Sequence, residues 1–521
     1  MLNSESRVKN SARNAVFSMS CQIITLLCTF ITRTIFIRYL GSSYLGINGL
    51  FTNILTVLSI ADLGFDTAVI YSLYKPIADN DEKKLNALVN YFKKVYIVIG
   101  ILIAITGICF IPFLGYLVNL ETAIENVTIY YILYLLDTVF TYFLANRTAI
   151  ISADQKLYVI KKYTLFFKII QSICQIIALI CFKNFLVYLI IQIICTFSTN
   201  LYGAIKVKKM YPFLKDKQVP LEKKEKKEIF SNVRSMFVYK IGGVVLNNTD
   251  NILISILITT EMVGLYSNYT MIINAVQAIV VILFTSMLAS VGNLNATSTI
   301  EKRKNVFYKI DFLAVWIYGI TALCIMILCN DFINIMWGKE YVLSNLVLIA
   351  ALINYLIVGY MHPLRLYRET TGVFKEVKYI FICTSILNLI FSIVLGYKLS
   401  SVELKLFGII IATAIARVLT TVWFEPKKIF NNVFKEGARN YLVNKLKDIS
   451  ILIVNVVICY YITNLVLVRS WITLILKGII CFGLSNVIFM VVYYKQENFK
   501  YFKEQMIRIV SHIREKNKEK N

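Results

Sequence analysis

Positively charged side chains stand inside stretches of the sequence that are otherwise apolar. Arg33, Lys168 and Lys240 each lie well within such a stretch. A charge in the hydrocarbon of a bilayer costs about 3 kcal/mol or more unless it is paired or reached by water. Cations that face one cavity there would attract phosphate strongly, because a low dielectric strengthens Coulomb attraction and a guanidinium binds two oxygens at once. These residues therefore indicate a binding site for a phosphorylated anion within a membrane.

Two further cations stand at the end of another apolar stretch. The sequence MHPLRLYRE places Arg365 and Arg368 about one helical turn apart. Long cationic side chains near the end of a span can also extend to the lipid headgroups. Arg365 and Arg368 are thus candidates for the anion site, with a structural role as the alternative. Asp62 could in the same way serve only to satisfy Arg33.

Acidic and neutral polar side chains form a second set inside the apolar stretches. Asp62 and Asp66 are four residues apart and share one face of a helix. Lys240, Asn247 and Asn251 are spaced by seven and by four, so they line one stripe. A partly buried carboxylate that exchanges a proton or binds Na⁺ would let an ion gradient bias two conformations. The candidates for this ion-coupling or cavity-lining role are Asp62, Asp66, Asp137, Asn247, Asp250, Asn251, Tyr266 and Asn268.

The same inventory argues against metal chemistry and catalysis. His362 and His512 are the only histidines, and no two of the eleven cysteines form a CxxC pair. The cysteines lie mostly in apolar runs, where cysteine behaves as a small hydrophobe. We expect no cofactor beyond a possible coupling ion, H⁺ or Na⁺. We also expect a protein that is not an enzyme, because its short outward connections leave no room for an external catalytic domain.

The bulk composition indicates a polytopic, all-α membrane protein. Of the 521 residues 58% are hydrophobic and only 16% are charged, and the mean hydropathy is +0.67. A transmembrane helix needs about 20 apolar residues. About fourteen stretches meet that need, with the second and seventh the most polar. They are approximately 14–38, 45–74, 95–118, 127–150, 158–182, 185–205, 232–258, 262–291, 307–329, 341–363, 377–397, 405–424, 449–468 and 471–494.

The distribution of basic residues predicts the topology. The net charge is +25, which by itself could suggest a nucleic-acid partner. The charge is divided among short connections, however, so we expect no nucleic acid. With a cytoplasmic N-terminus, 45 of the 55 Lys and Arg residues fall on inward segments and five on outward connections. This follows the positive-inside rule and predicts that both termini are cytoplasmic.

A polar linker and a short repeat predict the domain organisation. The basic segment 206–228 separates six predicted spans from eight. Leu45-Gly46-Ile47 and Val263-Gly264-Leu265 match at an offset of 218 residues, as expected if a six-helix unit was duplicated. We therefore predict two six-helix lobes followed by an additional helix pair. The boundaries are 1–207 for the first lobe, 208–231 for the basic linker, 232–430 for the second lobe, 431–495 for helices 13 and 14, and 496–521 for a basic tail.

Several of these motifs together resemble a known family. The pattern Arg33-x4-Arg38-Tyr-Leu-Gly-x3-Leu-Gly-Ile-x-Gly-Leu, then Asp62-Leu-Gly, is similar to polysaccharide repeat-unit flippases of the Wzx type. The second half adds Asn-Thr-Asp250-Asn-Ile-Leu-Ile-Ser, then Val-Gly-Leu-Tyr266-Ser-Asn-Tyr. These flippases belong to the multidrug/oligosaccharidyl-lipid/polysaccharide exporter superfamily. The resemblance covers roughly residues 1–430, and its motifs are characteristic only as a set.

The resemblance implies a function and a location. An undecaprenyl-diphosphate-linked oligosaccharide, the unit of an O-antigen or capsule, would cross the bacterial cytoplasmic membrane by alternating access. Arg33 would be the cavity arginine of the first helix. Lys240 and several asparagines stand in the second lobe, where some members carry more arginines. The resemblance therefore does not assign the family's full set of binding residues to this sequence. Membrane lipids and polysaccharide polymerase or assembly proteins would be the partners. A polymerase or glycosyltransferase, and a multidrug or cation extruder of the same superfamily, remain the alternatives.

Overall fold

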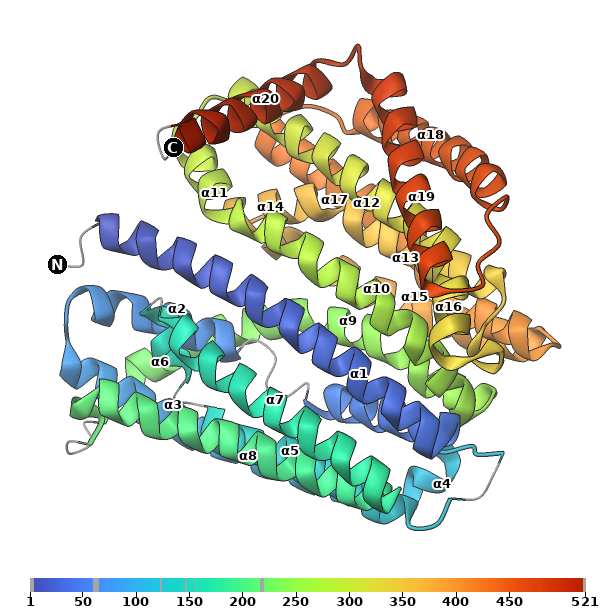
Figure 1. Ribbon diagram of the computed structural model, residues 1–521. Coiled ribbons are helices and arrows are strands. Elements are labelled where there is room, and N and C mark those ends of the chain that lie inside the picture. The colour runs from blue at the N-terminus through green and yellow to red at the C-terminus, as the bar shows by residue number, and fades with distance from the viewer. Residues whose placement is uncertain are drawn as a thin grey trace. The chain divides into compact units, whose positions relative to one another are not determined.

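The regular structure of the chain is helical throughout its described part (Figure 1). The computed structural model describes residues 4–59, 65–121, 124–145, 148–154, 156–215 and 220–518. Across these ranges every regular element is a helix and no strand occurs. The prediction of an all-α polytopic membrane protein is confirmed.

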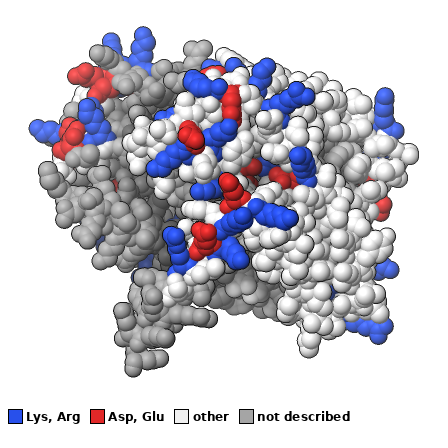
Figure 2. Space-filling model, turned by 90° about the horizontal axis from the view of Figure 1, so that it is seen from above, with Lys and Arg blue, Asp and Glu red and all other residues white. Residues whose placement is uncertain are grey.

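Many of the helices are long and apolar enough to cross a membrane. Eleven of the described helical segments meet that criterion by length and composition, and the shorter helix 127–143 is also apolar. The predicted seventh span lies in α9 (Lys223–Leu257), which is not among the eleven and holds three asparagines and an aspartate in its second half. The count of fourteen and the cytoplasmic placement of both termini remain predictions. Lys and Arg side chains gather in groups on the surface, with uncharged areas between them (Figure 2).

The chain forms two compact units, each built from two segments of sequence. The first contains residues 1–271 and 378–416, and the second contains residues 272–377 and 417–521. These units are defined by packing, and the lobe boundaries predicted from the sequence remain predictions.

The first unit is organised around its first helix. The helices of this unit are α1 (Ser4–Leu58), α2 (Phe65–Ala78), α3 (Glu82–Cys109), α4 (Leu114–Leu117), α5 (Val127–Ala145), α6 (Thr148–Ala153), α7 (Leu157–Phe182), α8 (Phe185–Met210) and α9. Three more helices lie partly in it, α10 (Thr260–Ser286), α15 (Phe374–Lys398) and α16 (Val402–Leu419). Helix α1 packs on α7 and α9, while α8 packs on α5 and α7. Helix α1 breaks at Gly41, which has φ 79° and ψ −170°. A positive φ suits glycine, and the break falls within the turn predicted between the first two spans.

Two glycines let α1 and α10 approach at backbone distance. A Cβ added to Gly46 would collide with the carbonyl of Thr260. A Cβ added to Gly264 would lie 2.5 Å from the carbonyl oxygen of Ser42. Gly46 and Gly264 are the paired glycines of the 218-residue repeat, so the repeat marks the place where these helices cross. A nearby hydrogen bond from the Thr260 amide to the carbonyl of Asn119, 2.7 Å long, fixes the start of α10.

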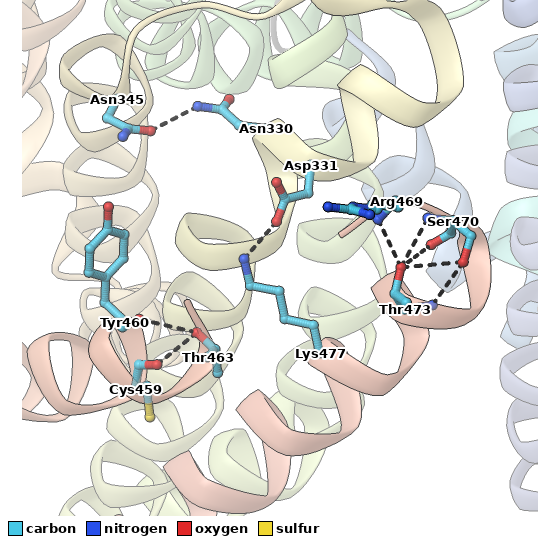
Figure 3. Close-up of polar contacts among 10 residues, drawn as sticks. All are labelled: Asn330, Asp331, Asn345, Cys459, Tyr460, Thr463, Arg469, Ser470, Thr473 and Lys477. Carbon is cyan, nitrogen blue, oxygen red and sulfur yellow. Dashed lines mark hydrogen bonds and ion pairs between the residues drawn. The ribbon is translucent and has the colours of Figure 1, made fainter. Parts of the chain in front are cut away.

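The second unit is organised around α12, its longest helix. The helices of this unit are α11 (Leu288–Thr297), α12 (Ile300–Trp337), α13 (Asn345–Tyr360), α14 (His362–Thr371), α17 (Thr421–Ile429), α18 (Arg439–Thr463), α19 (Trp471–Tyr493) and α20 (Glu497–Lys518). Helix α12 packs on α13, α14, α18 and α19. The ammonium of Lys477 on α19 lies 2.7 Å from a carboxylate oxygen of Asp331 on α12 (Figure 3). This ion pair attaches the predicted additional helices to the helix that organises the unit.

The C-terminal helix α20 packs on α12 through aromatic rings. The ring of Phe502 stacks on Phe312 at a centroid distance of 6.1 Å, and Phe499 lies 6.0 Å from Trp316. The Lys309 ammonium sits 3.8 Å from the ring centre of Tyr501. Aromatic side chains in the first turns of this basic tail therefore pack against the protein.

We predict that a methyl group at position 264 destabilises the protein. Gly264→Ala places its Cβ against the backbone of α1, which cannot move away as a side chain could, so the free energy of unfolding should fall by about 1–3 kcal/mol. Thermal unfolding of the purified protein measures this change.

Gly243→Ala is the matched control, because no atom lies within 4 Å of the added Cβ. Alanine is the better helix former by about 1 kcal/mol, so this variant should unfold no earlier than the wild type. Equal unfolding temperatures for the two variants would contradict the close approach of α1 and α10.

Candidate functional site

The guanidinium of Arg33 is held by neutral oxygens of α10. Its Nε donates a 2.8 Å hydrogen bond to Oδ1 of Asn268, and its Nη2 donates to Oγ of Ser267. The hydroxyl of Tyr188 on α8 also lies near the guanidinium. No acidic side chain pairs with Arg33 among the residues that the structure describes. Its positive charge is therefore hydrogen-bonded but not neutralised.

The groups around Arg33 suit an anion. Oriented hydrogen-bond donors and a fixed positive charge, in surroundings from which water is largely excluded, bind phosphate oxygens strongly. The side-chain Nδ2 of Asn268, which is fully buried, has no hydrogen-bond partner among the described residues. An arriving phosphate could accept hydrogen bonds from this amide and from the guanidinium together. The geometry of the first unit brings together Arg33, predicted for the anion site, and Asn268, predicted as an ion-coupling or cavity-lining residue, and both roles remain predictions.

The two predicted lysines take different places. Lys168 on α7 lies near the thiols of Cys28 on α1 and Cys195 on α8, and it forms no ion pair within the described part of the chain. Cys28 precedes Arg33 by five residues, which is about 7.5 Å along a helix axis at 1.5 Å per residue. Lys168 is therefore a second uncompensated cation facing the same helix as Arg33. Lys240 is half-buried on α9.

The arginines at the end of the tenth predicted span are both paired. Arg365 is exposed and its Nε lies 2.8 Å from Oε1 of Glu369. Arg368 forms an ion pair with Glu425 of α17, and their side chains are only 6% and 1% exposed. These carboxylates neutralise both cations, and the geometry of the second unit agrees with the structural alternative given for them. Their role in binding substrate remains a prediction.

Asp250 lies within a set of oxygen-bearing side chains from three helices. The Thr413 hydroxyl on α16 donates to Oδ2 of Asp250 at 3.0 Å, and Nδ2 of Asn388 on α15 donates to the Thr413 hydroxyl at 2.7 Å. The Ser392 hydroxyl donates to the carbonyl of Ile409 at 3.3 Å. Asn388, Ser392 and Thr413 are all buried. We call Asp250, Asn388, Ser392, Thr413 and the Ile409 carbonyl the α9/α15/α16 oxygen set.

The donor set fits a small monovalent cation better than a divalent one. Its ligands would be one carboxylate, hydroxyls, a carbonyl and the Oδ1 of Asn388, which has no hydrogen-bond partner among the described residues. Hard cations prefer such oxygens, and one carboxylate balances one positive charge. No group of three or more His, Cys, Asp or Glu side chains able to hold a metal ion occurs in the described ranges.

Two predicted coupling residues stand close to this set. The Tyr266 hydroxyl on α10 lies near the Asp250 carboxylate. Asn251, next to Asp250 on α9, has an amide oxygen without a hydrogen-bond partner among the described residues. Asn247 is exposed and donates 2.7 Å to the carbonyl of Gly243 on its own helix. This hydrogen bond therefore stays within α9 and does not connect Asn247 to the oxygen set.

The remaining predicted carboxylates lie elsewhere or outside the described residues. Asp137 on α5 accepts a 2.9 Å hydrogen bond from Gln192 of α8. Asp62 falls outside the described residues. Asp66 lies in α2, and its side chain is outside the description as well.

Sequence reasoning missed four residues of these two groups. Ser267 stands inside the quoted motif Tyr266-Ser-Asn-Tyr, so a signal for it was present. Asn388, Ser392 and Thr413 gave none, because each is an ordinary small polar residue in an apolar helix. Thr413 is 163 residues from its partner Asp250 along the chain, and only packing brings the two together.

The sequence matches a known protein family. Residues 11–291, more than half of the chain, match the family of polysaccharide biosynthesis proteins. The chain belongs to that family. No curated protein sequence matches it. The family assignment agrees with the resemblance to polysaccharide repeat-unit flippases noted above.

Solved structures of one superfamily share this fold. The structure of the lipid II flippase MurJ in an inward closed conformation is 16% identical, with a TM-score of 0.63 over 92% of this chain and 99% of that one. An inward-facing multidrug resistance MATE transporter of the MOP superfamily is 12% identical, with a TM-score of 0.62 over 78% and 97%. A mutant of the Vibrio cholerae MATE transporter VcmN is 14% identical, with a TM-score of 0.55 over 82% and 100%. At these identities the likeness shows the fold alone: that of the MOP superfamily transporters.

We predict that Arg368 stabilises the second unit. Arg368→Ala leaves Glu425 buried without its partner, which typically costs about 3–5 kcal/mol. Thermal unfolding should therefore occur at a clearly lower temperature. The control Arg365→Ala breaks an exposed pair worth about 0–1 kcal/mol and should unfold nearly as the wild type does.

The two roles for Arg368 give different results. Loss of transport by Arg368→Ala with unchanged thermal stability would show that Arg368 binds substrate and that the structural assignment is wrong.

Proposed function

We propose that this protein is a flippase for an undecaprenyl-diphosphate-linked oligosaccharide, which it moves from the inner to the outer leaflet of a bacterial cytoplasmic membrane. The observation that carries the proposal is Arg33, a cation inside an apolar helix bundle with only neutral hydrogen-bond partners among the described residues. A diphosphate is the group whose charge such a site would complement. The oligosaccharide itself can be bound by the hydroxyl and amide side chains around it.

The family and the fold support this reading. Membership of the polysaccharide biosynthesis family supports a cargo that contains sugars. A lipid II flippase has the same fold over 92% of this chain. A cation extruder of the superfamily would have to bind cargo beside the positive charges of Arg33 and Lys168, which repel it. The flippase is therefore preferred over the extruder, and also over a polymerase or glycosyltransferase.

Transport would proceed by alternating access. In one state the diphosphate enters from the cytoplasmic side and takes hydrogen bonds from Arg33 in place of those to Ser267 and Asn268. Replacement of these bonds frees α10 from α1 at that point, because both partners of Arg33 lie on α10. The polar head then crosses within the protein while the polyprenyl tail remains in the lipid. We propose that membrane lipids and polysaccharide assembly proteins are the partners of this transporter.

We also propose that the α9/α15/α16 oxygen set couples transport to an ion gradient. Binding of one monovalent cation or proton at Asp250 would change the bonds from Thr413 and the environment of Tyr266. Tyr266 directly precedes Ser267 and Asn268 on α10, so a shift of this helix reaches the partners of Arg33. An ion that binds one conformation of the set more tightly than the other biases the access states by that difference in affinity.

The first test replaces Arg33 in a strain whose own gene is deleted and which has no second flippase. The deletion should trap lipid-linked oligosaccharide on the inner face, measured by labelling from each side of the membrane. Arg33→Ala should restore less than about a tenth of wild-type export, the effect of losing about 1.4 kcal/mol or more of binding to the transported anion. Arg33→Lys should restore part of it.

Arg38→Ala is the matched control, because Arg38 lies five residues further along α1 and is exposed. It should restore export. Full restoration by Arg33→Ala would remove Arg33 from the site. Normal surface polysaccharide in the deletion strain would refute the flippase itself.

The second test concerns the coupling ion. Asp250→Asn and Thr413→Val remove the charge and the hydroxyl of the oxygen set, so transport in proteoliposomes should lose its dependence on an imposed Na⁺ or H⁺ gradient. Asp137→Asn, outside the set, should keep that dependence. A gradient-dependent Asp250→Asn variant would rule out the set as the coupling site.

A further inference from the structure

Three charged residues of the second unit meet in a place that the proposed transport site does not use. Asp311 of α12, Lys445 and Asp448 of α18 have side chains only 10%, 11% and 18% exposed. The ammonium of Lys445 lies 2.7 Å from Oδ1 of Asp311 and 4.0 Å from Oδ2 of Asp448. Two carboxylates, one buried and one mostly buried, thus share one ammonium, and the three residues together carry one negative charge more than they can pair.

Tyrosine hydroxyls surround the carboxylates. Tyr493 of α19 donates a 2.8 Å hydrogen bond to Oδ1 of Asp448, and Tyr441 of α18 donates to Oδ1 of Asp311 at 3.4 Å. Tyr360 of α13 is 7% exposed, faces both carboxylates, and its hydroxyl has no hydrogen-bond partner among the described residues. Tyr308 of α12 faces Asp311 as well. Apart from Lys445, the neighbours among the described residues supply hydroxyls and no further positive charge.

An unpaired buried negative charge is expensive, so the excess must be neutralised. When two carboxylates share a buried site, keeping both ionised has a high free-energy cost unless enough positive charge faces them. A metal ion is a poor solution here, because it would lie within a few ångströms of the Lys445 ammonium. A proton requires no coordination shell and occupies one oxygen.

We propose that Asp311 and Asp448 hold one proton between them at neutral pH, while Lys445 neutralises the remaining charge. The proton comes from water and converts one carboxylate to a carboxylic acid. That acid can donate a hydrogen bond, and the unpartnered hydroxyl of Tyr360 is a buried acceptor for it. The two aspartates titrate as a pair, so the proton belongs to the site and not to one residue.

The site lies where α18 packs against α12, so the presence of its proton affects how strongly these two helices are held together. With the proton present, the ion pair of Lys445 and Asp311 closes the contact between the two helices. When the proton leaves, a second buried negative charge weakens the packing of α18 against α12. The site is thus a pH-sensitive attachment of the additional helix pair. It does not depend on the proposed transport function.

Infrared spectroscopy of the full-length protein in lipid nanodiscs tests the proposal. The C=O stretch of a protonated carboxylic acid is separate from the bands of carboxylates and amides. The wild type minus Asp448→Asn spectrum at neutral pH should contain one such band, and wild type minus Asp311→Asn should contain the same band, because the pair shares one proton. The control is Asp331→Asn, which removes a carboxylate with its own partner, Lys477, and should leave the band in place.

Thermal unfolding against pH gives a second readout. The folded protein holds a proton that the unfolded chain does not hold at neutral pH, so stability should fall as the pH rises through the release. Asp448→Asn keeps the pair of Lys445 and Asp311 and should flatten that fall, whereas Asp331→Asn should retain it. Asp448→Asn decides the question if Asp311→Asn does not fold.

Two results would overturn the proposal. One is a difference spectrum for Asp448→Asn without a carboxylic-acid band, which would mean that both aspartates are ionised in the wild type. The other is loss of the wild-type band on addition of Na⁺, which would show that the site binds a metal cation in place of the proton.

Discussion

The cost of charge in a low-dielectric interior governs how this protein is built. Three buried cations of the second unit each have a carboxylate within ion-pair distance: Arg368 has Glu425, Lys445 has Asp311 and Lys477 has Asp331. In the first unit Arg33 has only Ser267 and Asn268. The same physical rule that explains the paired residues as structure makes the unpaired one the best candidate for binding an anion.

The neutral partners of Arg33 are placed by close helix packing. Helices α1 and α10 can approach at backbone distance only because Gly46 and Gly264 carry no side chain. This approach lies about one turn from Ser267 along α10, so the guanidinium reaches that helix without needing an ionic partner. Small residues are the usual means of close packing in membranes, where hydrophobic burial contributes little to association.

The proposed transport cycle and the proton site use different parts of the chain. Arg33, Asp250 and their neighbours lie in the first unit, whereas Asp311, Lys445 and Asp448 lie in the second. The same fold occurs in a multidrug resistance transporter and in a lipid II flippase, so the fold does not choose the cargo. The choice depends on charge at particular positions, and here the described part of the first unit offers Arg33 and Lys168 without acidic partners.

The sequence alone determined the class of protein, because hydropathy and the distribution of basic residues depend only on composition along the chain. It also singled out Arg33 and Asn268 as candidate site residues and the paired glycines as a repeat, since each stands out against an apolar background. Only the tertiary structure decided which charges are neutralised. Glu425 lies 57 residues from Arg368, and no periodicity connects them. Thr413 became the partner of Asp250, and Asn388 the partner of Thr413, for the same reason: hydrogen bonds between separate helices depend on how those helices pack, and local sequence does not encode that contact.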